Sequence, residues 1–293
     1  MQAHQYQWGI KQWVEYLKDK ETPVLDTTRA AIAALREGGE AACEQLSALT
    51  MTNLVYADPY LALKLLRRAE ERRTRQLGHD TTTPLAAILQ TGFDELQEIV
   101  EASPPNDRPL AGCQACEQRA VLASRIARAW ANRRVDVSPD EVAMAALLAE
   151  IGELLLWHFA SEMTDKETQV RDWNARFSAL MPRPSEIEFT FRHLTMALAQ
   201  AWDLPNLVVM LIKGTDTPRA NIARLAAEIA KIVSDGPEPA ALLAILRQTQ
   251  PVIPAASQAE LAEALPLSEA LRSGLAAAML AEAASASTCT ETT

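Results

Sequence analysis

The most chemically suggestive pair in the sequence is two cysteines at CxxC spacing, Cys113 and Cys116. Thiolates at this spacing can bind zinc or cycle as a redox disulfide. No second pair accompanies them, so a zinc site would need histidines or carboxylates from elsewhere in the chain. A redox pair favours a strand-to-helix context, and none is visible here. We therefore expect two ordinary cysteines near the start of a helix.

Histidines, the commonest acid-base and metal-binding side chains, are few and scattered. The four are His4, His79, His158 and His193. No HExxH or comparable local pair can be built from them, and the chain has no phosphate-binding glycine loop and no GxSxG motif. We interpret His193, inside a predicted helix, as a hydrogen-bonded core residue rather than a ligand. The sequence thus offers no local catalytic machinery.

Two other clusters of reactive or aromatic residues have plain interpretations. The arginine-rich segment 67–75 is interspersed with glutamates at spacings that allow ion pairs along one helix, so we interpret it as a solvated face rather than an anion site. Trp8, Trp13 and Tyr16 lie close to helical spacing. We expect these rings to pack onto the body of the protein rather than to bind nucleobases.

The composition limits the class of protein. The chain has 293 residues, 48% of them hydrophobic, and a net charge of −10. A chain this acidic would be repelled by nucleic acid. No run reaches the roughly 18 uncharged apolar residues that a membrane span needs, and the N-terminus does not resemble a signal peptide. We expect a soluble, cytoplasmic protein with reduced thiols, since four cysteines are too few for a disulfide framework.

The elements that would position these residues all read as helices. Ala, Leu, Glu, Gln and Arg dominate, and no sustained apolar-polar alternation marks a strand. Capping residues, prolines and glycines predict helices over 26–36, 40–50, 58–75, 83–90, 94–101, 117–132, 138–159, 166–179, 185–202, 205–213 and 218–234. The best-marked start is Ser138-Pro139, with a cap, a proline at the first helical position and early acidic residues.

Two segments rich in helix breakers divide the chain. The first is 103–109, SPPNDRP, and the second is 235–239, DGPEP. They predict an N-terminal helical lobe over 1–102, a helical core lobe over 103–236 and a C-terminal extension over 237–293. We expect the extension to form two or three Ala/Leu-rich helices before a frayed tail, SASTCTETT.

Six separated stretches resemble one family in the right order. They are TPVL at 22–25, ADPYLALKLLR at 57–67, PLAAILQTGF at 84–93, LLAEIGELLLW at 147–157, AWDLP at 201–205 and LIKGTDTP at 211–218. The chain is similar over about 22–236 to the HDOD domain, a branch of the HD metal-dependent phosphohydrolase superfamily. That resemblance implies an all-α, two-lobed HD-domain-like bundle, to which the C-terminal helices would be an addition.

The same resemblance exposes the departures that bear on function. In active HD enzymes a metal held by histidines and aspartates generates the attacking hydroxide. The matching positions of this chain, taken in order, are Gln118 for an early His, Ala149 and Glu150 for the His-Asp pair, Thr215 and Asp216 for a His pair, and Ala227 for a late Asp. Alanine has no lone pair, and glutamine and threonine are poor ligands for a catalytic transition metal.

A ligand set this depleted predicts a vestigial cleft that binds neither metal nor cofactor. Only Glu150, Asp216 and His193 would survive as donors. We expect Ala149 and Glu150 to continue the helix, since both are good helix formers. We expect Gly152 to allow close helix packing.

The resemblance therefore predicts a non-catalytic HDOD module of a bacterial signal-transduction pathway. It would act through an unidentified signalling protein, without nucleic acid or membrane, and self-association is left open. Two alternatives stand beside it. One is a phosphohydrolase in which Glu150, Asp216 and a nearby Asp or Glu hold Mg²⁺ or Mn²⁺. The other is a module that senses a nucleotide without turnover.

Overall fold

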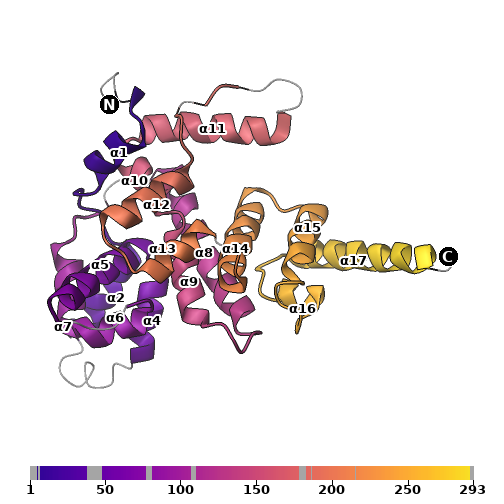
Figure 1. Ribbon diagram of the computed structural model, residues 1–293, viewed down its shortest axis with the longest axis horizontal. Coiled ribbons are helices and arrows are strands. Elements are labelled where there is room, and N and C mark those ends of the chain that lie inside the picture. Colours follow the sequence, from indigo (N-terminus) through magenta and orange to yellow (C-terminus); the bar gives the residue numbers. More distant parts are fainter. Residues whose placement is uncertain are drawn as a thin grey trace.

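The expected all-α fold is confirmed. The computed structural model describes residues 5, 7–37, 48–76, 81–106, 110–177, 183–185, 187–214 and 216–290, and within them the regular structure is helical throughout (Figure 1). The helices are α1 (Ile10–Leu17), α2 (Asp26–Glu37), α4 (Ala48–Tyr56), α5 (Pro59–Gln76), α6 (Pro84–Thr91), α7 (Phe93–Ala102), α8 (Ala111–Ala131), α9 (Pro139–Leu148), α10 (Ile151–Phe159), α11 (Ser161–Phe177), α12 (Phe191–Ala201), α13 (Asn206–Lys213), α14 (Pro218–Asp235), α15 (Pro239–Thr249), α16 (Gln258–Ala262) and α17 (Glu269–Thr290).

Predicted helix starts before a proline are confirmed. At the best-marked one α9 begins at Pro139, but the Ser138 side chain makes no capping bond. The Thr83 hydroxyl accepts from the backbone N–H of Ala86 and begins α6, and Thr217 does the same for α14. Asp58 caps α5 and is fully buried. Its carboxylate accepts from the N–H groups of Leu61, at 3.0 Å, and Leu25, at 2.8 Å, so the cap also fixes the segment that leads into α2.

The arginine run of α5 does more than form a solvated face. The expected pairing along the helix is present, since Arg73 Nε lies 2.6 Å from Glu70. Arg68 and Arg72, however, both bind Glu95 of α7, whose side chain is only 9% exposed. These ion pairs therefore attach α5 to its neighbour, within the group formed by α2 and α4–α7 (Figure 1).

Helices α8, α9 and α14 pack against one another and form the centre of the molecule. One contiguous apolar cluster runs from the N-terminal helices through this centre into the C-terminal ones. Trp130 of α8 is 1% exposed and donates through Nε1 to the carbonyl of Leu261, which attaches the C-terminal helices to the centre. Helix α17 then projects away from the body (Figure 1).

Helix α1 packs far from its neighbours in sequence. Trp13 and Leu17 are fully buried in a second apolar cluster with residues of α10 and α12, such as Leu155 and Leu194. Trp8 meets Trp13 edge to face, with ring centroids 5.1 Å apart. The N-terminal rings thus pack onto the body as expected, against helices of the 103–236 range.

The predicted helix over 138–159 is interrupted at Ala149 and Glu150, which corrects the expectation that these residues continue it. The cause is Thr195 of α12. Its hydroxyl donates to the carbonyl of Ala149 and accepts from the N–H of Gly152, both at 3.0 Å, and so replaces the helical bonds there. Gly152 is required for this contact, because a Cβ there would lie 2.7 Å from Thr195 Oγ1 and 2.8 Å from the Phe191 carbonyl.

Other boundaries also differ from those predicted. Helix α8 begins at Ala111, six residues early, so both cysteines lie inside it. Helix α17 continues to Thr290, so most of the tail expected to fray is helical. Residues 40–47 of one predicted helix lie outside the described residues.

The α9–α10 stretch Pro139–Phe159 is, among the described residues, the one long and apolar enough to cross a membrane by composition. Of its most apolar window, 78% is buried inside the protein. Burial of this extent is what a core helix shows.

Candidate functional site

A partly open cavity of about 250 Å³ lies where α8, the α9–α10 junction, α12, α13 and α14 meet. We call it the central pocket. Its charged lining consists of five cations, Arg119, Arg171, Arg192, Arg224 and Lys231, and three carboxylates, Glu150, Glu153 and Glu228. The chain as a whole has a net charge of −10, so this cavity is locally cationic on an acidic protein.

Arg119 of α8 is the central charge of the pocket. It is 8% exposed, and its Nη2 lies 2.9 Å from Glu150 Oε2 and 2.8 Å from Glu153 Oε2. Burial alone would lower the pKa of this guanidinium, but the neighbouring acidic groups raise it above its usual value. Arg119 is therefore a permanent cation. Its Nε is buried and has no hydrogen-bond partner among the described residues.

The two carboxylates around Arg119 are held by the helix interruption. Glu150 occupies the junction itself, with φ −91° and ψ 0°, and Glu153 follows in the first turn of α10. Burial raises the pKa of Glu153, and Arg119 opposes that rise. Trp157 Nε1 donates to the second oxygen of Glu153 at 3.3 Å. The guanidinium thus compensates two acidic groups that would otherwise repel each other.

Three of the residues predicted for the vestigial cleft line the central pocket: Ala149, Glu150 and Ala227. Gln118 does not. It is exposed and lines a separate cavity on another face of α8, together with Arg125.

The remaining predicted residues lie away from the pocket lining. His193 is exposed on α12, which corrects its interpretation as a core histidine. Asp216 is exposed and accepts from the Asn221 side chain at 3.3 Å. Thr215 lies outside the described residues.

Sequence reasoning missed the residue that matters most. The early histidine position was matched to Gln118, whereas Arg119 points into the pocket, and one residue along a helix turns the side chain by about 100°. No signal in the sequence marks this, since Arg119 directly follows the polar residues Glu117 and Gln118. Its burial is seen only in the structure, and a buried arginine requires carboxylate partners.

The site residues do not fit the catalytic metal that the HD resemblance implies. Cys116, Glu150 and Glu153 offer three atoms within 4.8 Å of one another. Arg119, however, already donates to both carboxylates and places a fixed positive charge between them. Ala149 supplies no ligand atom.

Comparison with known proteins agrees with this architecture. The HDOD domain matches residues 40–218. Among solved structures, the MmoQ response regulator of Methylococcus capsulatus str. Bath has a TM-score of 0.61 at 20% identity, covering 85% of this chain and 99% of that one. A virulence factor of Campylobacter jejuni subsp. jejuni has a TM-score of 0.65 at 15% identity, covering 91% and 98%.

At these sequence identities the solved structures show the fold alone. A search of curated proteins gave no match. The HDOD match itself spans more than half of the chain, and its residues include the α9–α10 junction, Arg119 and most of the central pocket. The chain therefore belongs to the HDOD domain family.

Proposed function

We propose that this protein is a non-catalytic regulatory module that acts in bacterial signal transduction by binding another signalling protein. The observation that carries its non-catalytic part is the position of Arg119 between Glu150 and Glu153. A guanidinium cannot bind water as a Lewis acid or lower its pKa, which is what the metal does in hydrolysis. The ion pairs keep the pocket folded and charge-compensated without a metal.

The test of this proposal is hydrolysis by the full chain. Phosphomonoester, phosphodiester and cyclic-dinucleotide substrates would be supplied with Mg²⁺, Mn²⁺, Fe²⁺ or Zn²⁺ in turn. We expect the wild type, the Glu150→Gln variant and the exposed control variant Glu263→Gln all to show no hydrolysis above the rate measured without protein. Metal-dependent turnover that Glu150→Gln abolishes and Glu263→Gln retains would overturn the proposal in favour of a carboxylate-rich hydrolase.

The cationic lining supports a second candidate, a module that senses an anionic ligand such as a nucleotide without turnover. Arg171 is stacked over the Phe191 ring at 3.8 Å and paired with Glu167, and Arg192 is fixed by two bonds to the Ile212 carbonyl. Their positions are thus set before any ligand arrives. Lys231 is exposed beside them and could adjust to a phosphate.

Ligand-induced stabilisation tests the second candidate. A ligand that binds only the folded chain at about 100 times its Kd would stabilise it by about 2.7 kcal/mol. If this candidate holds, at least one member of a nucleotide panel should raise the Tm of the wild type. The same nucleotide should raise the Tm of Lys231→Ala by less. Lys11→Ala, whose substitution lies outside the pocket, should show the full wild-type shift in Tm. The absence of a shift across the panel would remove this candidate.

A further inference from the structure

Four polar side chains meet between α5, α8 and α10, apart from the lining of the central pocket; three are buried and His158 is partly buried. Tyr60 comes from α5, Cys113 and Glu117 from α8, and His158 from the end of α10. Tyr60 is 0% exposed, Cys113 2% and Glu117 7%. Burial of this many ionisable groups is costly unless they are matched to one another or to a ligand.

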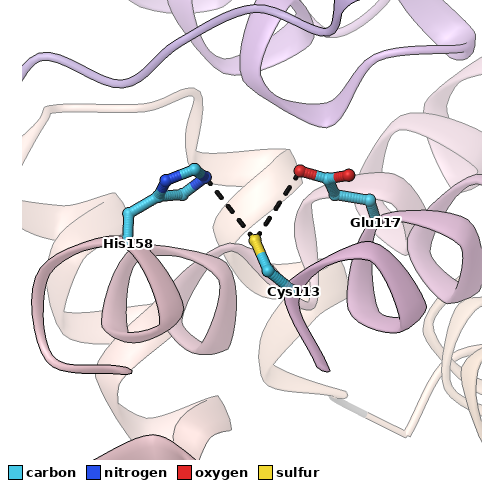
Figure 2. Close-up of side chains that lie close together, drawn as sticks. All are labelled: Cys113, Glu117 and His158. Carbon is cyan, nitrogen blue, oxygen red and sulfur yellow. Dashed lines mark hydrogen bonds between the residues drawn. The ribbon is translucent and has the colours of Figure 1, made fainter. Parts of the chain in front are cut away.

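The donor atoms converge on one point. Cys113 Sγ lies 3.6 Å from His158 Nε2 and 3.7 Å from Glu117 Oε1, and Figure 2 shows the imidazole and the carboxylate turned toward the sulfur from opposite sides. The Tyr60 hydroxyl lies 2.9 Å from Glu117 Oε1, 2.8 Å from His158 Nε2 and 3.6 Å from Cys113 Sγ. The first three atoms all lie within 4.8 Å of one another.

The separations from Cys113 Sγ suit tetrahedral zinc. Zinc binds sulfur at about 2.3 Å and nitrogen or oxygen at about 2.0–2.1 Å, so adjacent ligand atoms stand roughly 3.3–3.6 Å apart. The distances from Cys113 Sγ to His158 and Glu117 lie at or just beyond the upper end of this range. The Tyr60 hydroxyl is closer to His158 and Glu117, at hydrogen-bond distance, so it is a partner of these ligands rather than a ligand itself. Cys113 and Glu117 are also four residues apart on one helix, the spacing that places two metal ligands on the same face.

We propose that Cys113, Glu117 and His158 bind one zinc-class divalent cation, with the Tyr60 hydroxyl beside it as a hydrogen-bond donor to Glu117. Binding forms a bond from the thiolate sulfur to the metal and releases the thiol proton to solvent. Thiolate and carboxylate then balance the two positive charges, and the imidazole and phenol stay neutral. Thiolate and imidazole together favour zinc over magnesium or calcium.

The proposed ion is structural. Tyr60 and Cys113 are at most 2% exposed, so the protein closes off the position next to the three ligands and leaves little room for a substrate. The ligands come from α8 and α10, and Tyr60 of α5 is hydrogen-bonded to Glu117, so the site would join the N-terminal helices to the helices that carry the central pocket. The interpretation of the CxxC motif changes accordingly: Cys113 is a ligand and Cys116, beside Arg119 at 3.4 Å, is not.

Metal content of full-length, untagged protein tests the proposal. Protein purified without chelator, loaded with Zn²⁺ and desalted, should contain about one zinc per chain. Cys113→Ser and His158→Gln should lose it. Cys116→Ser is the matched control, because it removes another buried thiol one turn along the same helix, and it should retain the zinc. Loading with Co²⁺ should give thiolate charge-transfer absorption in the wild type and in Cys116→Ser but not in Cys113→Ser.

Circular dichroism of the metal-free forms separates ligand loss from unfolding. A Cys113→Ser chain as helical as the metal-free wild type, yet unable to bind zinc, supports the site. If Cys113→Ser does not fold, the zinc content of His158→Gln and the cobalt spectrum of the wild type test the site instead. Loss of zinc in His158→Gln together with thiolate charge-transfer absorption in the wild type supports the site, and the opposite result overturns it. Zinc absent from the loaded wild type, or retained by a folded Cys113→Ser, overturns the site.

The outcome can be told apart from that of the proposed function. Zinc lost in Cys113→Ser, with no hydrolysis, supports the site and leaves the regulatory proposal intact. Zinc retained in Cys113→Ser but lost in Glu150→Gln would place the ion in the central pocket and overturn the zinc site at Cys113. Hydrolysis by such zinc-loaded protein would overturn the regulatory proposal as well.

Discussion

Arg119 determines how the central pocket works because its charge is fixed and its partners are buried. It supplies one positive charge to two carboxylates that belong to the interrupted segment between α9 and α10. In a metal-dependent site a cation from solution would have this role. Here the cation is covalently part of α8, so the arrangement is independent of metal supply.

Replacing Arg119 with methionine should destabilise the fold. The substitution keeps most of the side-chain volume but leaves Glu150 and Glu153 close together without a cation. Removing one partner of a buried ion pair typically costs about 3–5 kcal/mol, and we expect about 3 kcal/mol at pH 7 by urea unfolding. Arg224→Met is the control, because its pair with Glu228 is solvent-exposed and should change stability by less than about 1 kcal/mol. Equal effects of the two variants would contradict the assigned role.

The cost of Arg119→Met should shrink as the pH falls. Burial already raises the pKa of Glu153 above 4.5, and loss of Arg119, which opposes that rise, raises it further. At pH values between the pKa of Glu153 in the unfolded chain and its higher pKa in the folded variant, the folded variant binds more protons than the unfolded chain. Its free energy of unfolding therefore increases as the pH falls through this window. Urea unfolding of the wild type and of Arg119→Met at pH 7 and pH 5 measures this effect. A difference in the free energy of unfolding between the two proteins that stays constant or grows at pH 5 would contradict the prediction.

Among the helices, the contact between α10 and α12 fixes the shape of the pocket. Thr195 interrupts the backbone hydrogen bonds at Ala149, and the resulting junction aims Glu150 at Arg119. The contact depends on the absence of a side chain at Gly152.

Gly152→Ala should therefore destabilise the protein although alanine is the better helix former. The added Cβ would overlap Thr195 and the Phe191 carbonyl, and overpacking of this kind costs about 1–3 kcal/mol. Gly274→Ala in α17 is the control, since its Cβ would meet only Pro239, at 3.2 Å. We expect the control to stay within about 1 kcal/mol of wild type, in the range of the helix-propensity gain. A Gly152→Ala protein with wild-type Tm would show that α12 does not approach α10 this closely.

Over the whole molecule, the C-terminal helices are part of the main core. Leu242, Leu246 and Leu261 are at most 1% exposed and belong to the same apolar cluster as α8 and α14. Each buried leucine contributes about 1.5–3 kcal/mol, so together they approach the net stability of a typical domain.

Deleting residues 237–293 should therefore prevent stable folding of the remainder. We expect the shortened chain to aggregate or to melt far below the wild type, because the face of α8 around Trp130 would be exposed. A chain ending at Glu282 is the control and should unfold in one transition near the wild-type Tm. A soluble 1–236 chain with wild-type Tm would show that the extension folds separately.

The sequence by itself determined the helical class and several helix starts, because caps, prolines and apolar periodicity act over a few residues. The family followed from the resemblance of six short motifs in the right order. Thr83 and Thr217 begin helices because each side chain accepts a hydrogen bond from a backbone N–H three residues later. The family's short motifs are present in order although the metal ligands are replaced. The division into 1–102, 103–236 and 237–293 stays a prediction, with α1 packed against α12 from another range.

Only the tertiary structure decided which side chains meet. The interruption at Glu150 is imposed by Thr195, 45 residues later, against the helix propensity of both residues at the junction. Arg119 and Gln118 are adjacent in sequence, yet they face different cavities because each helical residue turns by about 100°. Cys113 and His158 lie 45 residues apart, and no local spacing pairs them. Contacts of this kind depend on how whole helices pack, which the pattern within any one helix does not specify.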